Sequence, residues 1–287
     1  MMFSGTLQAR EAIHPIHKLP DRPMHISQIF IADAPENRLP PALESASNTI
    51  RAAFPNAHHT LFNRETLRAF ISQHYDSEVT WAFDKLRPYA YKADLGRYCL
   101  LNAIGGWYFD ISIRCINTFH PDEDITFLAF RDIQRCSLTS WACSNTILYS
   151  RPDNHALQTA IANIVHNCKT DYYGITPLCP TGPTLLGQAL AIHGGRSDFI
   201  YGDVLELTPN HEKKNRAFVL PDGMILAWSK PAEGGDLTKF DARGTNNYNT
   251  FWHEMEVYAQ NEESTVESGK NKSLFSMFFP VNADRQT

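Results

Sequence analysis

The segment from Lys92 to Ser112, with the sequence KADLGRYCLLNAIGGWYFDIS, gathers the residues of this chain that are best suited to chemistry. Asp94 and Arg97 are three positions apart, so a helix would place both on one face. A carboxylate can accept hydrogen bonds from sugar hydroxyls, and a planar guanidinium can donate two bonds to one phosphate. The pair is therefore suited to hold a sugar and a phosphate, although such a pair in isolation is more often a surface ion pair.

Asp110 lies in a predicted strand from Trp107 to Ile113, where alternation places Tyr108, Asp110 and Ser112 on one face. A carboxylate among aromatic and β-branched residues needs a partner, because burying an unpaired charge is costly. A divalent cation or the hydroxyls of a ribose would provide one, and magnesium and manganese prefer carboxylate oxygen. The alternative is an ordinary position on the solvent-facing side of a strand.

The whole segment resembles the sugar-binding region of DXD-type glycosyltransferases, family thirty-two and its relatives. These enzymes are related to yeast α-mannosyltransferases, bacterial capsule transferases and the large clostridial glucosylating toxins. Their signature is roughly A-x-x-S/A-D-x-x-R-x-x-x-L-x-x-x-G-G-x-Y-x-D-x-D. The positions that fall on it here are Ala90, Ala93, Asp94, Arg97, Leu101, Gly105, Gly106, Tyr108 and Asp110.

A looser similarity extends from Ile26 to Tyr258. The run Ile26 to Ala32, followed by a proline loop, is similar to the family's first strand, which holds the nucleotide base. The runs 145–147 and 181–183 resemble its downstream donor-side and acceptor-side elements. The run 244–248, with His253, resembles the C-terminal motif of bacterial members. Without the resemblance, 181–183 is simply a turn into a helix, and His253 is an exposed helical histidine.

The resemblance implies an α/β fold of the GT-A type, which binds a nucleoside diphosphate on a central mixed, mostly parallel sheet. It also implies that Asp94 binds ribose or sugar hydroxyls, that Arg97 contacts the sugar and the diphosphate, and that Tyr108 lines the donor pocket. The implied catalytic residues are Asp110 and Arg97. Further implied donor-binding residues are Ile31, Gly105, Gly106, Ser112, Thr181 and Gly182, and the implied metal ligands are Asp110, Asn247 and His253.

The chain departs from the signature at Ser112, where the family commonly has a second, metal-binding aspartate. A neutral hydroxyl is a poorer ligand for a hard dication than a carboxylate, so we expect weaker affinity for Mn²⁺ or Mg²⁺. Three outcomes stay open. The metal persists, held by Asp110, the diphosphate and a C-terminal residue; or cationic side chains and helix N-termini stabilise the leaving diphosphate; or the protein binds a nucleotide sugar without transferring it.

The implied activity is transfer of a hexose or N-acetylhexosamine from a UDP- or GDP-linked donor to a hydroxyl of a glycan or lipid-linked glycan. Bacterial surface polysaccharide, capsule or O-antigen, is the expected context, and the anomeric configuration is expected to be retained. A toxin-like transferase that modifies host protein and a non-catalytic nucleotide-sugar-binding protein are the alternatives. No single residue of the sequence can be named as a base or a nucleophile.

These residues must be positioned by helices and strands, which alternate in a way that favours an α/β domain. We expect an irregular lead-in over residues 1–25, a transferase domain over 26–260, and a polar tail over 261–287 whose apolar patch, Leu274 to Phe279, docks on the domain. The expected helices span 43–53, 64–75, 77–86, 89–104, 154–168 and 184–193. The expected strands span 26–32, 59–62, 107–113, 125–130, 146–150 and 204–207, with a hairpin of 217–220 and 224–228.

The composition excludes several classes of protein. A net charge of -5 over 287 residues argues against a nucleic-acid-binding protein. The six cysteines form no Cys-x-x-Cys pair, so a zinc or redox motif is not expected. Neither a signal peptide nor an apolar run long enough to span a membrane is visible. We therefore expect a cytoplasmic protein, with peripheral association at the inner face of the membrane left open.

Overall fold

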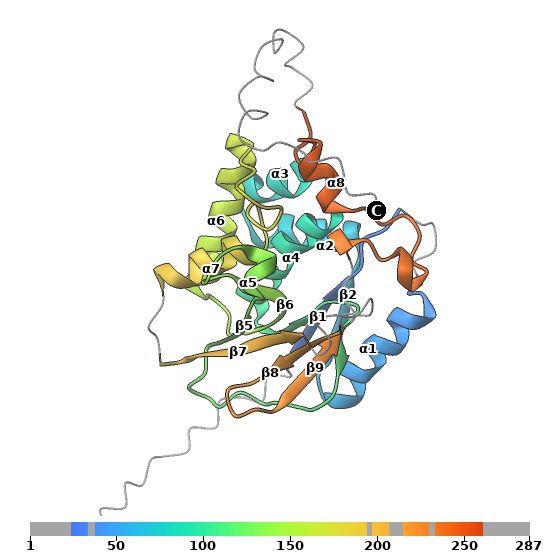
Figure 1. The fold of residues 1–287 in the computed structure, drawn as a ribbon, viewed down its shortest axis with the longest axis vertical. Coiled ribbons are helices and arrows are strands. Elements are labelled where there is room, and N and C mark those ends of the chain that lie inside the picture. Colours follow the sequence, from blue (N-terminus) through green and yellow to red (C-terminus); the bar gives the residue numbers. More distant parts are fainter. Residues whose placement is uncertain (1–23, 34–37, 194–196, 207–214, 230–232, 261–287) are drawn as a thin grey trace, which may run out of the picture.

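A nine-stranded sheet forms the frame of the molecule (Figure 1). The computed structural model describes residues 24–33, 38–193, 197–206, 215–229 and 233–260. The predicted lead-in as far as residue 23 and the predicted tail, with Leu274 to Phe279, lie outside the described residues. The strands are β1 His25–Ile29, β2 His58–Phe62, β3 Gly106–Phe109, β4 Arg114–Cys115, β5 Phe127–Arg131, β6 Cys143–Ser150, β7 Phe199–Glu206, β8 Arg216–Val219 and β9 Ile225–Ser229.

The strands follow the order β2-β1-β3-β6-β5-β7-β8-β9-β4. Three pairings are parallel, namely β1 with β2, β1 with β3, and β5 with β7. The other five are antiparallel. The expected α/β fold with a mixed sheet is confirmed, but parallel pairings do not predominate. The reason is that β6 runs against both of its neighbours, while β8 and β9 form the predicted hairpin.

Helices cover both faces of this sheet (Figure 1). On one face lies α1 Pro41–Ala53, where Ile50 packs with Trp107 and Phe109. The other face carries the larger core, which is built from the longer remaining helices. These are α2 Arg64–His74, α3 Ser77–Lys85, α4 Tyr89–Ile104, α6 His155–Thr170 and α7 Pro183–Ile192; the short helices are α5 Gln134–Ser137 and α8 Tyr248–His253. Of the helices described, none is long and apolar enough to cross a lipid bilayer.

Helix α4 has the predicted bounds and is buried along nearly its whole length. It follows Pro88 and ends at Gly105, whose φ of 68° lies in the left-handed region that glycine adopts without strain. A Cβ on Gly106 would lie 2.1 Å from the backbone oxygen of His25, so the second glycine allows β3 to approach β1. The Gly-Gly pair therefore ends the helix and starts the strand.

Strand β3 is shorter than predicted, because it ends at Phe109 instead of Ile113. The chain turns there, and the N–H of Ile113 donates to the oxygen of Asp110 at 3.0 Å. Ile111 packs with Leu43 in a small separate cluster, whereas Ile113 joins the core beneath α1. The alternating apolar residues thus serve two different clusters, which is why alternation alone predicted a longer strand.

Candidate active site

A cavity of about 1110 Å³ opens at the edge of the sheet where several strands end. Strands β1, β3, β5 and β7 run in one direction, so their carboxyl ends share this edge, and β6 and β8 begin there. Open α/β sheets bind ligands at such edges. Among the lining residues are Ile31 after β1, Asp110 after β3, Asp132 after β5, Asn145 in β6 and Arg216 in β8.

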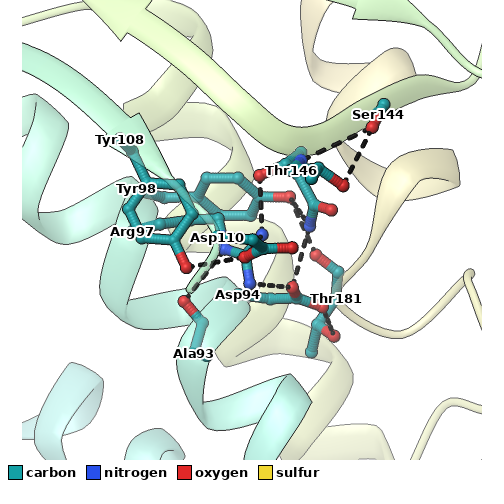
Figure 2. A network of polar contacts seen from close by, with 10 residues as sticks. Ala93, Asp94, Arg97, Tyr98, Tyr108, Asp110, Ser144, Thr146 and Thr181 are labelled. Atoms are coloured by element: carbon teal, nitrogen blue, oxygen red, sulfur yellow. Dashed lines mark hydrogen bonds and ion pairs between the residues drawn. The ribbon is translucent and has the colours of Figure 1, made fainter. Parts of the chain in front are cut away.

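Arg97 is the centre of a buried polar network beside this cavity (Figure 2). Its Nη2 lies 3.2 Å from Oδ1 of Asp94, and its Nη1 lies 3.1 Å from Oδ1 of Asp110. Nη1 also donates to the oxygen of Asn145 at 2.6 Å, and Nε donates to the oxygen of Ala93 at 3.2 Å. Four of the five N–H groups of a guanidinium are thereby used, which leaves one on Nη2.

Asp94 is equally well satisfied. Its Oδ1 accepts from Nδ2 of Asn145 at 2.8 Å, and its Oδ2 accepts from the hydroxyl of Thr181 at 2.7 Å. Tyr98 closes the network, since its hydroxyl accepts from Asn145 and donates to the backbone oxygen of Thr181. Burial raises the pKa of the Asp94 carboxyl to about 6, although Arg97 and the Thr181 hydroxyl act to lower it.

Asp110 faces the cavity more openly, with 32% of its side chain exposed against 5% for Arg97. Its Oδ1 accepts from the hydroxyl of Tyr108 at 2.8 Å in addition to its contact with Arg97. The ring of Tyr108 stacks on the guanidinium, with its centroid 4.5 Å from Cζ. No hydrogen bond from the described residues reaches Oδ2 of Asp110, so one carboxylate oxygen remains for a ligand.

The Arg97 guanidinium remains charged in this setting. Burial on its own lowers the pKa of Arg97, but the neighbouring Asp110, Tyr108 and Asp94 outweigh it and raise the pKa above its ordinary value. The two carboxylates therefore share one buried cation. A buried cation of this kind holds its partners in place strongly, because removing it leaves two uncompensated negative charges.

The other residues expected from the sequence lie in different places. Ile31, Ser112, Gly182 and Asn247 line the cavity. Thr181 is fully buried and reaches it through Asp94. Outside the lining lie Gly105, Gly106 and His253.

Three of these positions have evident structural roles. Gly105 and Gly106 lie at the far end of α4, against Pro152 and His25. Asn247 caps α8, because its Oδ1 accepts from the N–H of Asn249 at 2.9 Å.

One wall of the cavity comes from the segment 233–249. This segment continues into α8, which is fixed to the domain by the indole of Trp252 donating to the oxygen of Tyr173 at 2.9 Å. Beyond α8 the backbone of Val257 accepts from the N–H of Arg87 at 2.8 Å. The late part of the chain therefore encloses a site whose polar groups come mostly from earlier elements.

Sequence reasoning missed three polar residues of this region, Tyr98, Asp132 and Arg216. Tyr98 is one turn from Asp94 on α4, so helical spacing would have found it. Asp132 directly follows the strand β5, and Arg216 begins β8. The rule that ligands bind at the carboxyl ends of parallel strands was a usable signal for Asp132, but it requires the strand order.

A divalent cation would find few protein ligands in this cavity. Among the described residues there is no group of three histidine, cysteine, aspartate or glutamate side chains able to hold a metal ion. Asp110 offers one carboxylate oxygen, and Ser112 lines the cavity close to it in sequence. Magnesium commonly binds through one or two carboxylates plus substrate phosphates, so these residues suit a cation that a diphosphate helps to hold.

Comparison with known proteins confirms the resemblance seen in the sequence. Residues 40–127 match the family described as glycosyltransferase sugar-binding region containing DXD motif, and this range includes Asp94, Arg97 and Asp110. A stretch of 54 residues is 33% identical to an uncharacterised glycosyltransferase of Acanthamoeba polyphaga mimivirus. It covers 19% of this chain and 22% of that protein, so the match spans about a fifth of the relative.

Two solved structures have a similar arrangement over part of the chain. The PaToxG glycosyltransferase is 15% identical with a TM-score of 0.48, covering 60% of this chain and 69% of that one. The ligand-free glycosyltransferase domain of the YGT toxin is 8% identical with a TM-score of 0.44, covering 60% of this chain and 78% of that one.

Proposed function

We propose that this chain is a glycosyltransferase that moves a sugar from a nucleotide-sugar donor to a hydroxyl group of an acceptor. The observation that carries the proposal is the placement of Asp94, Arg97 and Asp110. These residues form one network at the edge of a ligand-sized cavity, within the range that matches the sugar-binding region of glycosyltransferases. An ordinary surface ion pair would have no such setting.

In this proposal Asp110 meets the diphosphate end of the donor. The Tyr108 hydroxyl and Arg97 fix its Oδ1, so that Oδ2 is presented to the cavity in one orientation. Arg97 uses its remaining Nη2 proton to donate to an oxygen of the donor. Asp94 orients that guanidinium and borders the donor sugar, while Ile31 and Gly182 contribute to the walls.

The leaving nucleoside diphosphate develops negative charge as the bond to the anomeric carbon breaks, and stabilising that charge is the main catalytic task. We propose that Asp110 would hold Mn²⁺ or Mg²⁺ beside the diphosphate, with Ser112 as a weak additional ligand. The ion would supply charge neutralisation at the leaving group. His253 lies outside the cavity lining, so this assignment depends on Asp110.

The finer assignments follow the family resemblance: a hexose or N-acetylhexosamine as the transferred group, UDP or GDP as its carrier, and retention of the anomeric configuration. The acceptor class that accompanies them is a glycan or lipid-linked glycan of bacterial capsule or O-antigen. Proton NMR of the first sugar released from the donor, recorded before it mutarotates, tests retention directly.

A second candidate is a protein that binds a nucleotide sugar without transferring it. The observation that favours it is Ser112, which leaves Asp110 without the second carboxylate that would complete a stronger metal site. The two candidates share the donor site and differ in turnover.

Release of nucleoside diphosphate from a panel of UDP- and GDP-sugars, with manganese and with EDTA, separates these candidates. A transferase releases diphosphate from one donor, and Asp110→Ala abolishes the release. The matched control is Asp124→Ala, which removes an exposed carboxylate outside the cavity lining and should leave the rate unchanged. Nucleotide binding without release, even with added acceptors, supports the binding protein. Absence of any nucleotide binding contradicts both.

A further inference from the structure

The cavity contains a second acid–arginine pair, Asp132 and Arg216, which the proposed donor site does not use. Asp132 follows β5, Arg216 is the first residue of β8, and both line the cavity together with Asp110. In the sheet, β6 separates β3 from β5. Asp110 and Asp132 therefore stand two strands apart, which is roughly 10 Å at the usual strand spacing. That separation leaves room for a second sugar beside the donor.

Among the described residues, Arg216 lacks the oxygen partners that Arg97 has. Its Nη2 donates to Sγ of Cys136 at 3.6 Å, and sulfur is a weak acceptor. Its Nε is buried and has no hydrogen-bond partner among the described residues. An unpaired buried N–H is costly, and more so on a charged group. This guanidinium is therefore short of an oxygen acceptor.

Asp132 gives the pair its chemical selectivity. Burial raises the pKa of its carboxyl, while the N–H of Ile133 and the charge of Arg216 act to lower it. A negative ligand that approached Arg216 would meet this carboxylate, and a positive ligand that approached Asp132 would meet the guanidinium. A neutral ligand with adjacent hydroxyls satisfies both, because one hydroxyl donates to the carboxylate and the other accepts from the guanidinium.

Tyr248 shows that the two acid–arginine pairs face a common space. Its ring stacks on Tyr91 with the centroids 5.5 Å apart, and it lines the cavity. Burial raises the pKa of its hydroxyl, and Asp94, Arg216 and Asp132 all lie close enough to act on it electrostatically. This tyrosine and both pairs therefore line one cavity.

We propose that Asp132 and Arg216 form the acceptor subsite of the transferase proposed above, and that it binds a neutral sugar through adjacent hydroxyl groups. Asp132 accepts a hydrogen bond from one hydroxyl, and Arg216 donates to the oxygen of its neighbour. Both are positioning residues in this role, since they orient the acceptor beside the donor and take no part in the covalent step.

The test uses simple glycosides as acceptor probes: the methyl glycosides of glucose, galactose, mannose and N-acetylglucosamine. With the full chain and its donor, at least one should accelerate diphosphate release over hydrolysis. Asp132→Asn and Arg216→Ala should each weaken that acceleration by at least about tenfold, the loss expected for a hydrogen bond to a charged group. Their affinity for the donor nucleotide should stay within about threefold, which also verifies folding.

The matched control is Arg131→Ala, which removes the arginine next to Asp132 in sequence. Arg131 is exposed and pairs with Asp203 away from the cavity lining, so this variant should behave as the unaltered protein. Arg216→Lys keeps the positive charge and loses the planar guanidinium, so the acceleration by glycosides should lie between those of the unaltered protein and of Arg216→Ala.

Several results would overturn the proposal. If both variants kept full acceleration, or lost nucleotide affinity in parallel, the pair would not be an acceptor subsite. If methyl glucuronide bound more tightly than methyl glucoside through Arg216, the subsite would be one for anions. Protein that binds nucleotide but none of the neutral glycosides would refute it too. Failure of the proposed function looks different, because the unaltered protein would then either bind no nucleotide, or bind both nucleotide and glycoside and release no diphosphate.

Discussion

Two pairs of an aspartate and an arginine line the cavity, and they differ in how completely their polar atoms are hydrogen-bonded. Around Asp94 and Arg97, both carboxylate oxygens and four guanidinium N–H groups have partners. Around Asp132 and Arg216, the guanidinium has a sulfur contact and a buried N–H without a partner among the described residues. Residue type alone therefore does not show which pair is complete before a ligand arrives, whereas the hydrogen bonds of each side chain do.

The difference arises from how each pair is assembled. Asp94 and Arg97 share a face of α4, so the helix fixes their spacing before any ligand arrives. Asp132 and Arg216 come from β5 and β8, which β7 separates in the sheet. Both side chains line the cavity, and no ion pair joins them among the described residues. The first pair is therefore preorganised, and the second is completed by what it binds.

The largest effect expected from this comparison is the loss of stability in Arg97→Ala. Removing the shared cation leaves Asp94 buried and uncompensated, so the free energy of unfolding should fall by about 3 to 5 kcal/mol. Denaturant titration measures it. The control is Arg68→Ala, which breaks an exposed pair with Asp84 and should lower the free energy of unfolding far less. Equal losses in the two variants would mean that the buried contacts of Arg97 stabilise the fold no more than an exposed ion pair does.

The next effect is a pH dependence that belongs to Asp94. Burial raises the pKa of its carboxyl from 3.8 to about 6 on folding, so the folded state holds a proton between these values that the unfolded state has released. This contribution to stability is complete below pH 4 and is lost as the pH rises through 6, amounting to at most about 3 kcal/mol. Asp94→Asn should remove it, seen as a flatter curve of unfolding free energy against pH. An unchanged slope would contradict the raised pKa.

A smaller effect should be confined to the part of the cavity around Asp110, where we propose that the donor binds. Ser112→Asp adds a second carboxylate near Asp110, so the manganese concentration for half-maximal diphosphate release should fall about tenfold, or 1.4 kcal/mol. The affinity for glycosides at the Arg216 end should not change. Ser112→Asn, which adds similar bulk without charge, is the control. If both substitutions have the same effect, the change is steric and the cation does not bind here.

The smallest effect is expected at Arg216, in contrast to the large loss of stability expected at Arg97. Arg216→Ala removes a weak sulfur contact and an N–H that has no partner among the described residues, so the free energy of unfolding should change by no more than about 1 kcal/mol in either direction. The same denaturant titration measures it. A loss as large as that of Arg97→Ala would show that Arg216 stabilises the fold as much as Arg97 does, which contradicts the contrast between the two pairs.

Asp94 and Arg97, with the helix that carries them, could be predicted from the sequence, whereas Asp132 and Arg216 could not. The bounds of α4 follow from residues near one another in the chain, with Pro88 before the helix and Gly105 after it, and the structure has them. The end of β3 was predicted wrongly, because Ile111 and Ile113 satisfy two separate clusters. Asp132 and Arg216 escaped notice since only the strand order brings them together, and that order depends on contacts between distant segments.

The wall formed by segment 233–249 has a consequence for how the protein is made. All nine strands of the sheet, with both acid–arginine pairs, precede residue 230 in the chain. As the polypeptide leaves the ribosome, the strands and their charged groups emerge from the exit tunnel before this wall does. A nascent chain therefore exposes its polar groups first and encloses the cavity last, so the cavity stays open on this side until the whole domain has left the ribosome.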